Sequence, residues 1–183
     1  MDRALAATNV CIPMDTPSFL AALEAHKKIL YKIAYLYARS EADRQDLAQE
    51  IVIQLWRSVS GFDGRSQLST WIYRVALNVG LSHARERERR TRRTVAFDDA
   101  PAAAILSAPP DEGQVGVLAE LVGRLDELDR ALVLLFLEGH AHDAIAEILG
   151  LSVSNVGTKL HRITQKLRGM GQAETPAKEK VAR

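Results

Sequence analysis

The chain has 183 residues, of which 47% are hydrophobic, 26% charged and 5% aromatic, and its formal net charge is +1. This length allows one domain or two small ones, with enough apolar side chains for packed cores in either case. The single cysteine, Cys11, excludes an internal disulfide and provides no ligand cluster for zinc, which is typical of a reducing compartment. No long apolar run opens the chain, so we expect no signal peptide, no transmembrane segment and a cytoplasmic location.

The first predicted helix follows a segment without hydrophobic periodicity. Residues 1–15 are therefore predicted to form a loose N-terminal arm. Thr16 provides a capping hydroxyl, and Pro17 would occupy a first-turn position that needs no backbone N–H. We expect this helix to run to about Arg39, because apolar residues then recur near one face.

Two more helices are predicted in the N-terminal half. Ser40 and Asp43 resemble a capping box, and the helix that follows has apolar residues at every fourth position: Leu47, Ile51 and Leu55. The polar, glycine-containing segment 61–67 must end this helix. A third helix is predicted from about Ser69, and it continues into a cluster of arginines.

Charges are separated along the chain, although the net charge is near zero. Between residues 85 and 93 there are six arginines against two glutamates. Between residues 97 and 129, eight acidic residues accompany a single basic one, Arg124. The basic block is a candidate surface for phosphates, and a solvated helix end is the alternative.

The rest of the chain predicts a second helical domain. Residues 95–112 are rich in alanine and proline and are predicted to be a flexible linker. Residues 113–168 again show helical periodicity, with Asp126 placed to cap one helix, and residues 169–183 are predicted to be a disordered tail. We therefore expect an all-α protein with two small helical domains, 16–94 and 113–168.

Residues 144–151, with the sequence AIAEILGL, have the pattern of a helix-turn-helix. Ala146 is small enough for two helices to touch, and Gly150, four residues later, allows the chain to turn. Ser152 is expected to cap the second helix, whose outer face carries polar groups suited to base edges and phosphates: Ser154, Asn155, Thr158, Lys159, Arg162 and Lys166. Two packed amphipathic helices with a solvated face are the alternative.

Further motifs precede this unit in the N-terminal half. Residues 43–50 read DRQDLAQE, residues 62–66 read FDGRS, and residues 68–74 read LSTWIYR, followed by Asn78. In this order and spacing, together with Glu138-Gly139 and the helix-turn-helix, they resemble an extracytoplasmic-function sigma factor of the sigma-70 family. The resemblance implies sigma region 2 at residues 16–94 and region 4 at residues 113–168. It also implies a protein that binds core RNA polymerase, directs it to promoters and helps to melt the minus-ten element.

The resemblance implies a polymerase-binding site on the second helix. In that family the equivalent stretch binds the clamp helices of the largest polymerase subunit, which here points to Asp46, Gln49 and Glu50. On a helix these residues share one face at i, i+3 and i+4. A solvated acidic face is the alternative for such a segment taken alone.

The resemblance likewise implies sites for promoter DNA. The minus-ten element would contact Phe62, Arg65, Ser66, Thr70, Trp71, Arg74 and Asn78. Trp71 is the candidate wedge or stacking face, but a place in the core is an equal alternative, and Trp56 is interpreted as core in preference to interface. Backbone phosphates would contact Arg85, Arg89, Arg92 and Arg93.

Two positions depart from the family pattern in region 4. A serine or threonine is usual where this chain has Ala141, and a basic residue is usual near Gly157. The residues predicted to contact the minus-thirty-five element are therefore those of the polar face of the second helix. The side chains usual at positions 141 and 157 are not among them. Region 4 would also contact the flap of the polymerase.

No catalytic residues, cofactor site or metal site is expected, because the chain has no phosphate-binding glycine loop, activated nucleophile or metal-ligand spacing. The expected partners are core RNA polymerase, promoter DNA and an anti-sigma factor, with no insertion into a membrane. A stand-alone helix-turn-helix regulator is the main alternative. An enzyme with a C-terminal helix-turn-helix, such as a serine recombinase, would need a strand-rich catalytic domain.

Overall fold

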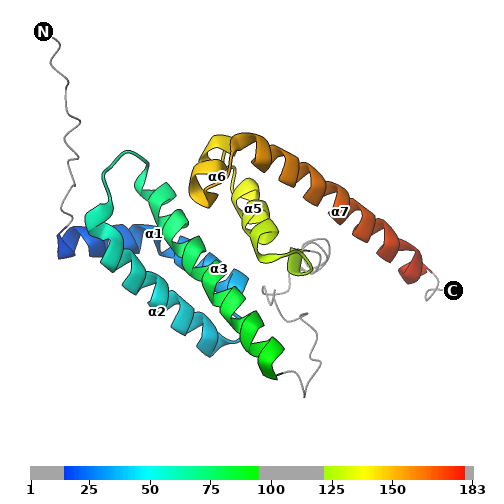
Figure 1. The fold of residues 1–183 in the computed structure, drawn as a ribbon, viewed down its shortest axis with the longest axis horizontal. Helices are drawn as coiled ribbons and strands as arrows, with labels where there is room; N and C mark the ends of the chain where they lie inside the picture. Colours follow the sequence, from blue (N-terminus) through cyan, green and yellow to red (C-terminus); the bar gives the residue numbers. More distant parts are fainter. Residues whose placement is uncertain (1–14, 95–121, 180–183) are drawn as a thin grey trace, which may run out of the picture.

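The computed structural model describes residues 15–94 and 122–179, and this part of the chain is helical with no strand. The first unit contains α1 (Thr16–Tyr37), α2 (Glu41–Ser58), the short 3-10 helix η1 (Val59–Gly61) and α3 (Leu68–Thr94). The second unit contains α5 (Glu127–Leu137), α6 (His142–Leu149) and α7 (Val153–Glu179). Figure 1 shows the three long helices of the first unit side by side, with α5 and α6 beside α3. The predicted all-α fold is confirmed.

Local capping explains where several helices begin. The Ser40 hydroxyl accepts a hydrogen bond from the Asp43 N–H at 3.1 Å, and the Asp126 carboxylate accepts one from the Asp129 N–H at 2.7 Å. Each bond satisfies one of the backbone donors that a helix N-terminus leaves unpaired. The predicted caps of α2 and α5 therefore form.

The cap of α1 differs from the prediction. Asp15, and not Thr16, is the capping residue, since its side chain accepts a hydrogen bond from the Ser18 N–H at 3.0 Å. Thr16 is the first helical residue, and Pro17 still lies in the first turn, where its missing N–H costs nothing. Aspartate and threonine are both good capping residues, so sequence alone placed the boundary one residue too late.

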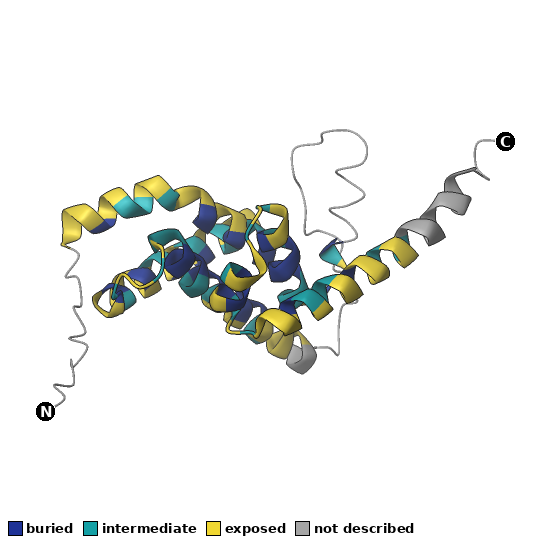
Figure 2. Cartoon of the chain, turned by 90° about the horizontal axis from the view of Figure 1, so that it is seen from above, coloured by how far each residue is buried: buried dark blue, intermediate teal, exposed yellow. Residues whose placement is uncertain are grey.

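A continuous apolar core lies where the first three helices meet. Ile33 from α1, Ile51 from α2 and Ile72 from α3 are almost fully buried. Burying a side chain of this kind stabilises the fold by about 1.5–3 kcal/mol relative to leaving it exposed. Figure 2 shows buried residues concentrated where the helices face one another, and exposed ones along the outer surfaces of α1 and α7.

A close approach between α1 and α3 depends on Gly80. A methyl group at this position would lie 2.6 Å from Cδ2 of Tyr37, closer than side chains tolerate. The absence of a side chain at Gly80 therefore lets the Tyr37 ring lie against α3, where only 1% of the residue is exposed.

The second unit has its own core and a turn of the predicted kind. Leu135 from α5, Ile145 from α6 and Val156 from α7 have no exposed surface. Gly150 ends α6 with a φ of 66°, a left-handed conformation that glycine adopts without strain. Ser152 accepts a hydrogen bond from the Asn155 N–H at 3.3 Å, so the predicted cap of α7 also forms.

Some predicted segments cannot be compared directly with the structure. The N-terminal arm, the linker 95–112 and the first residues of region 4 lie outside the described residues. Helix α7 continues to Glu179, through most of the segment predicted as a tail from Gly169. Residues with high helix propensity, including Gln172, Ala173 and Glu174, occupy that segment.

Candidate functional site

The acidic residues of α2 lie on its outer surface. Asp46, Gln49 and Glu50 are all exposed, whereas Leu47 and Ile51 on the opposite face are completely buried. The buried leucine and isoleucine fix the rotation of the helix, and the polar face must therefore point outward. The result is a rigid acidic surface suited to a basic partner.

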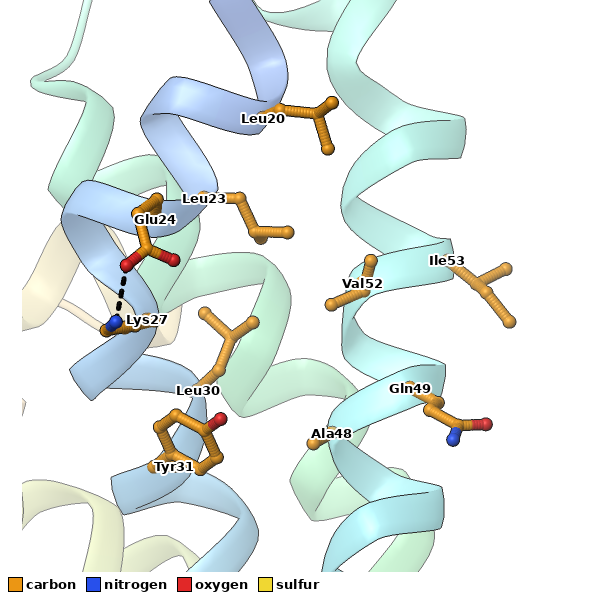
Figure 3. Close-up of a pocket in the computed structure, with 10 residues that line it drawn as sticks. All are labelled: Leu20, Leu23, Glu24, Lys27, Leu30, Tyr31, Ala48, Gln49, Val52 and Ile53. Carbon is orange, nitrogen blue, oxygen red and sulfur yellow. Dashed lines mark hydrogen bonds and ion pairs between the residues drawn. The ribbon is translucent and has the colours of Figure 1, made fainter. Parts of the chain in front are cut away.

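A groove between α1 and α2 borders this surface. It has a volume of about 720 Å³, and Gln49 lies on its rim beside the apolar side chains that line it. Figure 3 shows Leu20, Leu23 and Leu30 of α1 directed toward Ala48 and Val52 of α2, with Ile53 directed away. Leu20, Tyr31 and Ile53 are 57%, 67% and 49% exposed, which is unusual for large apolar residues that lie together.

A second, more polar groove separates α2 from α3. It has a volume of about 340 Å³ and is lined by Glu50, Gln54, Ser58, Val75, Asn78, Val79 and Ser82. Glu50 was predicted to bind polymerase and Asn78 to bind DNA, and the structure places both on this one groove. Sequence spacing does not predict this groove, because its walls come from two different helices and depend on how these helices pack.

The loop before α3 is ordered by its own side chains. Asp63 accepts a hydrogen bond from the Arg65 N–H at 3.1 Å and pairs with the Arg65 guanidinium at 3.2 Å. Gly64 has a φ of 71°, which few other residues adopt without strain. The Arg65 side chain remains 72% exposed and Ser66 is half-buried, so both predicted residues are accessible.

The two tryptophans occupy different environments, one buried and one exposed. Trp71 is 5% exposed, and its ring lies 5.4 Å from that of Phe62, which is also buried. In this arrangement Trp71 is a core residue, the alternative to a stacking face, and neighbouring Thr70 is buried as well. Trp56 was interpreted as core, and this is wrong: it is 46% exposed and packs edge-on against Phe19.

The remaining predicted minus-ten residues lie on α3. Asn78 is exposed and Arg74, one turn earlier, is half-buried. Their spacing of four residues places them on one side of the helix. A surface remains on α3 for a polar ligand, even though its aromatic residues face the core.

The arginine cluster forms the C-terminal part of α3. Arg85 and Arg89 are exposed, and Arg89 pairs with Glu86 at 2.5 Å. Arg87, which was not among the predicted phosphate contacts, donates a hydrogen bond to the carbonyl of Tyr37, and burial lowers its pKa. Arg92 and Arg93 lie in α3, but their side chains are outside the described residues.

The polar face of α7 matches the predicted helix-turn-helix. Five of its six predicted residues are exposed: Ser154, Asn155, Thr158, Arg162 and Lys166. The sixth, Lys159, is half-buried, and its ammonium lies 3.7 Å from the carboxylate of Asp129 on α5. Burial raises the pKa of that carboxyl group, and the neighbouring Asp126 adds to the effect.

The structure describes both positions at which the helix-turn-helix departs from the family pattern. Ala141 is the N-cap residue of α6 and makes no side-chain hydrogen bond to the helix. At Gly157 an added side chain would begin 3.9 Å from Nδ1 of His142, an ordinary contact distance. Within the described ranges, no helix combines the length and apolar content needed to cross a bilayer, and no group of acidic, histidine or cysteine side chains could hold a metal.

Family models match both units. The family described as "Sigma-70 region 2" matches residues 22–90, and "Sigma-70, region 4" matches residues 116–167. The first begins in α1 and ends near the end of α3, so it contains the polar groove and, except for Leu20, the residues that line the apolar groove. The second contains the whole helix-turn-helix.

Curated relatives cover most of the chain. The ECF RNA polymerase sigma factor SigE of Mycolicibacterium smegmatis is 28% identical over 162 residues, covering 83% of this chain and 61% of its own length. The ECF RNA polymerase sigma factor SigW of Bacillus subtilis is 23% identical over 169 residues, covering 84% of this chain and 89% of its own length. The chain thus spans less than two thirds of the first relative and most of the second.

Solved structures share the fold. The sigma factor RpoE from Bartonella quintana, in complex with the anti-sigma factor NepR, has a TM-score of 0.70 at 18% identity and covers 87% of this chain and 99% of its own. CnrH, in complex with the cytosolic domain of CnrY, has a TM-score of 0.62 at 22% identity, with 88% and 92% covered. These likenesses extend over both helical units.

Proposed function

Because the chain belongs to the extracytoplasmic-function sigma factors of the sigma-70 family, we propose that it binds core RNA polymerase and directs it to promoters. It then helps to melt the minus-ten element. The protein is a binding factor located in the cytoplasm, and the chemistry of RNA synthesis belongs to the polymerase. The observation that supports this most is the exposed acidic face of α2 beside an open apolar groove.

The polymerase would use two complementary features of this surface. Asp46 and Glu50 attract a basic partner, and Gln49 contributes hydrogen bonds at the rim of the groove. The apolar side chains of α1 and α2 would bury a helix that presents apolar residues at helical spacing. In the sigma-70 family the equivalent stretch binds the clamp helices of the largest polymerase subunit, which are therefore the proposed partner of this surface.

Promoter DNA would be read by both units. Arg65, Ser66, Arg74 and Asn78 are accessible for the minus-ten element, and Asn78 borders the polar groove. Arginines of α3 would contact phosphates, which position a protein on DNA without reading the sequence. The polar face of α7 would enter the major groove of the minus-thirty-five element.

An anti-sigma factor is a further proposed partner. One structural neighbour, RpoE from Bartonella quintana, is a sigma factor in complex with the anti-sigma factor NepR, and a second, CnrH, is in complex with the cytosolic domain of CnrY. The apolar groove between α1 and α2 would suit such a protein as well as polymerase, so the two would compete. Competition of this kind would silence transcription without any change in DNA binding by the isolated second unit.

The test is binding of the full chain to core RNA polymerase. We expect a stable complex that is lost in Asp46→Ala and in Glu50→Arg, because the first variant removes one of the two acidic side chains of this face and the second reverses the charge of the other. The matched control is Glu147→Arg, which reverses an exposed charge on α6, outside the proposed docking surface. The control should bind as well as the wild type.

The second part of the test is promoter opening, followed with a probe specific for single strands. The polymerase complex with wild-type protein should open DNA, and Arg74→Ala with Asn78→Ala should reduce opening while leaving polymerase binding intact. Binding to duplex DNA without any affinity for core polymerase would exclude the sigma function. It would support a stand-alone helix-turn-helix regulator.

A further inference from the structure

The basic side chains predicted to contact DNA from α7 lie along one edge of its polar face. This row has spacings of three and four residues, and it consists of Lys159, Arg162 and Lys166. A second row has the same spacings along the other edge of the exposed face, and it consists of Ser154, Gly157 and His161. The second row therefore contains no lysine or arginine, and its middle position has no side chain.

A helix in the major groove lies between the two phosphate backbones of the duplex. Contacts with phosphates fix the register and orientation of such a helix without reading sequence. The row that begins at Lys159 can reach one of these backbones. On the other side, Gly157 leaves a gap in the row. A phosphate contact at this gap would have to come from a different element.

The ring of His142 fills the gap. His142 is the first residue of α6, and α6 packs against α7. Its Nδ1 lies 3.9 Å from the point where the Cβ of a side chain at position 157 would be. The imidazole therefore occupies the space into which a side chain of α7 would extend from this position.

Helix α5 supports the ring from its other side. The rings of His142 and Phe136 have centroids 6.5 Å apart and planes inclined at 42°, which is within the range of an aromatic contact. Both residues are exposed, so the imidazole lies between Phe136 and Gly157 at the surface of the protein. In a helix-turn-helix the first helix crosses the DNA backbone, and His142 lies at the start of that helix.

We propose that His142 makes the phosphate contact for which Gly157 has no side chain. This inference rests on the proposed function, in which α7 enters the major groove of promoter DNA. The imidazole donates a hydrogen bond from a ring N–H to a phosphate oxygen of the backbone on the Gly157 side of α7. Glycine at position 157 leaves the space for the ring, and a long side chain there would compete with it.

The experiment measures binding to short DNA duplexes of unrelated sequence by fluorescence anisotropy. It uses the full-length chain, both alone and in complex with core RNA polymerase. His142→Phe keeps an aromatic ring beside Phe136 but has no N–H. We expect it to weaken binding by about tenfold, the loss typical of one hydrogen bond to a charged group. The loss should be nearly equal on every duplex, because a phosphate contact does not depend on sequence.

The matched control for this variant is on the same helix. Glu147→Ala removes an exposed side chain of α6 and should bind as the wild type does, apart from a small gain from the lost negative charge. Circular dichroism establishes that both variants are folded.

A second pair of variants tests whether the contact is made at Gly157. In a His142→Ala background, Gly157→Lys places an ammonium beside the vacated space and should restore most of the affinity. Gly157→Ala provides a similar gain in helix propensity without the charge, so it should not restore binding. In the wild-type background Gly157→Lys should have a smaller effect, because the lysine and the imidazole then compete for one place.

The outcomes separate this inference from the proposed function. Unchanged affinity in folded His142→Phe would overturn it, and so would a loss confined to some duplexes, since that would indicate a contact with a base. Equal effects of Gly157→Lys and Gly157→Ala, or equal gains from Gly157→Lys in both backgrounds, would overturn it as well. The absence of duplex binding in both forms would have the same meaning. If His142 affects DNA binding by the free chain and no complex with core polymerase forms, the proposed function fails and this inference stands.

Discussion

The rings of Phe62 and Trp71 lie 5.4 Å apart with an angle of 49° between their planes, and both residues are buried. This contact connects the glycine-containing loop to the first turn of α3. The loop carries Arg65 and the helix carries Arg74, so the aromatic pair sets the relative position of two proposed DNA contacts. If Arg65 and Arg74 contact DNA as proposed, the pair would act on DNA recognition by holding the loop in place.

Replacing Trp71 should therefore destabilise the protein. We expect Trp71→Ala to lower the free energy of unfolding by about 3–5 kcal/mol, as is usual for a large aromatic removed from a core. Trp71→Phe should cost less, because it retains a ring against Phe62. Urea denaturation followed by circular dichroism measures both. A surface wedge would instead give an almost unchanged free energy of unfolding and a selective loss of promoter opening.

Trp56 provides the comparison for this prediction. It is 46% exposed, with one contact to the ring of Phe19. Trp56→Ala should consequently cost clearly less than Trp71→Ala in the same denaturation experiment. Equal losses for the two tryptophans would contradict the assignment of Trp71 to the core.

The close approach at Gly80 leads to a second prediction. Alanine is usually about 1 kcal/mol better than glycine inside a helix. At Gly80, however, the added methyl group would lie 2.6 Å from the Tyr37 ring, and the hydrogen bond from Tyr37 to Glu127 keeps that ring from moving away. We expect Gly80→Ala to lower the free energy of unfolding by about 1–3 kcal/mol, the usual cost of overpacking.

Gly169 is the matched control for this substitution. It also lies inside a helix, α7, but an added Cβ there has nothing within 4 Å. Gly169→Ala should keep the gain in helix propensity and raise the stability of α7 by up to about 1 kcal/mol. Thermal denaturation of both variants checks the opposite signs. A stabilising Gly80→Ala would show that Tyr37 can move.

The cap of α6 is incomplete, and this gives a third prediction. Ala141 has the extended backbone of a capping residue, with φ −68° and ψ 156°, but makes no side-chain hydrogen bond. Ala141→Ser should raise the free energy of unfolding by about 0.5–2 kcal/mol. We expect the lower part of this range, since Asp143 already accepts a hydrogen bond from the Ala144 N–H at 2.9 Å.

A loss of comparable size is expected when an existing cap is removed. Ser152 caps α7 through the Asn155 N–H, so Ser152→Ala should lower stability where Ala141→Ser raises it. Chemical denaturation of the two single variants and of the double variant measures both effects. If Ala141→Ser left the free energy of unfolding unchanged, the N–H groups at the start of α6 would already be satisfied by Asp143 and by solvent.

Sequence predicts a structural feature of this protein well when the feature depends only on residues that are close together in the chain. Ser40, Asp126 and Ser152 were identified as caps because a cap depends on a few neighbouring residues. Gly150 was identified as the turn for the same reason. The prediction that Trp56 is buried is wrong, because its exposure depends on which surfaces α1 covers. No local sequence pattern contains that information.

The proposed functional surfaces also differ in how far sequence predicts them. Asp46, Gln49 and Glu50 were placed on one face from helical spacing alone, and the structure exposes them together. Whether they bind polymerase stays a prediction. The groove beside Gln49 needed the distance between α1 and α2, which sequence spacing does not give. The carboxylate of Glu138 accepts hydrogen bonds from Lys32 and Tyr73, and because these partners come from distant parts of the chain, sequence shows Glu138 only as part of a motif.

Asp129 gives a prediction about pH. Burial raises the pKa of its carboxyl group in the folded protein, so the folded state holds this proton more tightly than the unfolded state does. Its contribution to stability is fully present below the unfolded value of 3.8 and is lost as the pH rises through the raised folded pKa. At neutral pH the charged carboxylate is therefore less favourable in the fold than a neutral group of the same shape.

Asp129→Asn should remove this pH dependence. Relative to the wild type, we expect the variant to gain stability at pH 7 and to lose that advantage below about pH 4, where the wild-type carboxyl group is neutral as well. Urea denaturation at a series of pH values measures the difference. A constant difference across the series would mean that the pKa of Asp129 is the same in the folded and unfolded protein.

The same carboxylate also restrains a proposed DNA contact. Asp129 lies 3.7 Å from the ammonium of Lys159, on the polar face of α7. Asp129→Asn should free that charge for phosphate and tighten binding to duplex DNA, and the salt dependence should become steeper by up to about one released counterion. Fluorescence anisotropy across a salt series measures both changes. In a Lys159→Ala background the substitution should have a much smaller effect, and an equal effect there would show that Asp129 acts on DNA through its own charge.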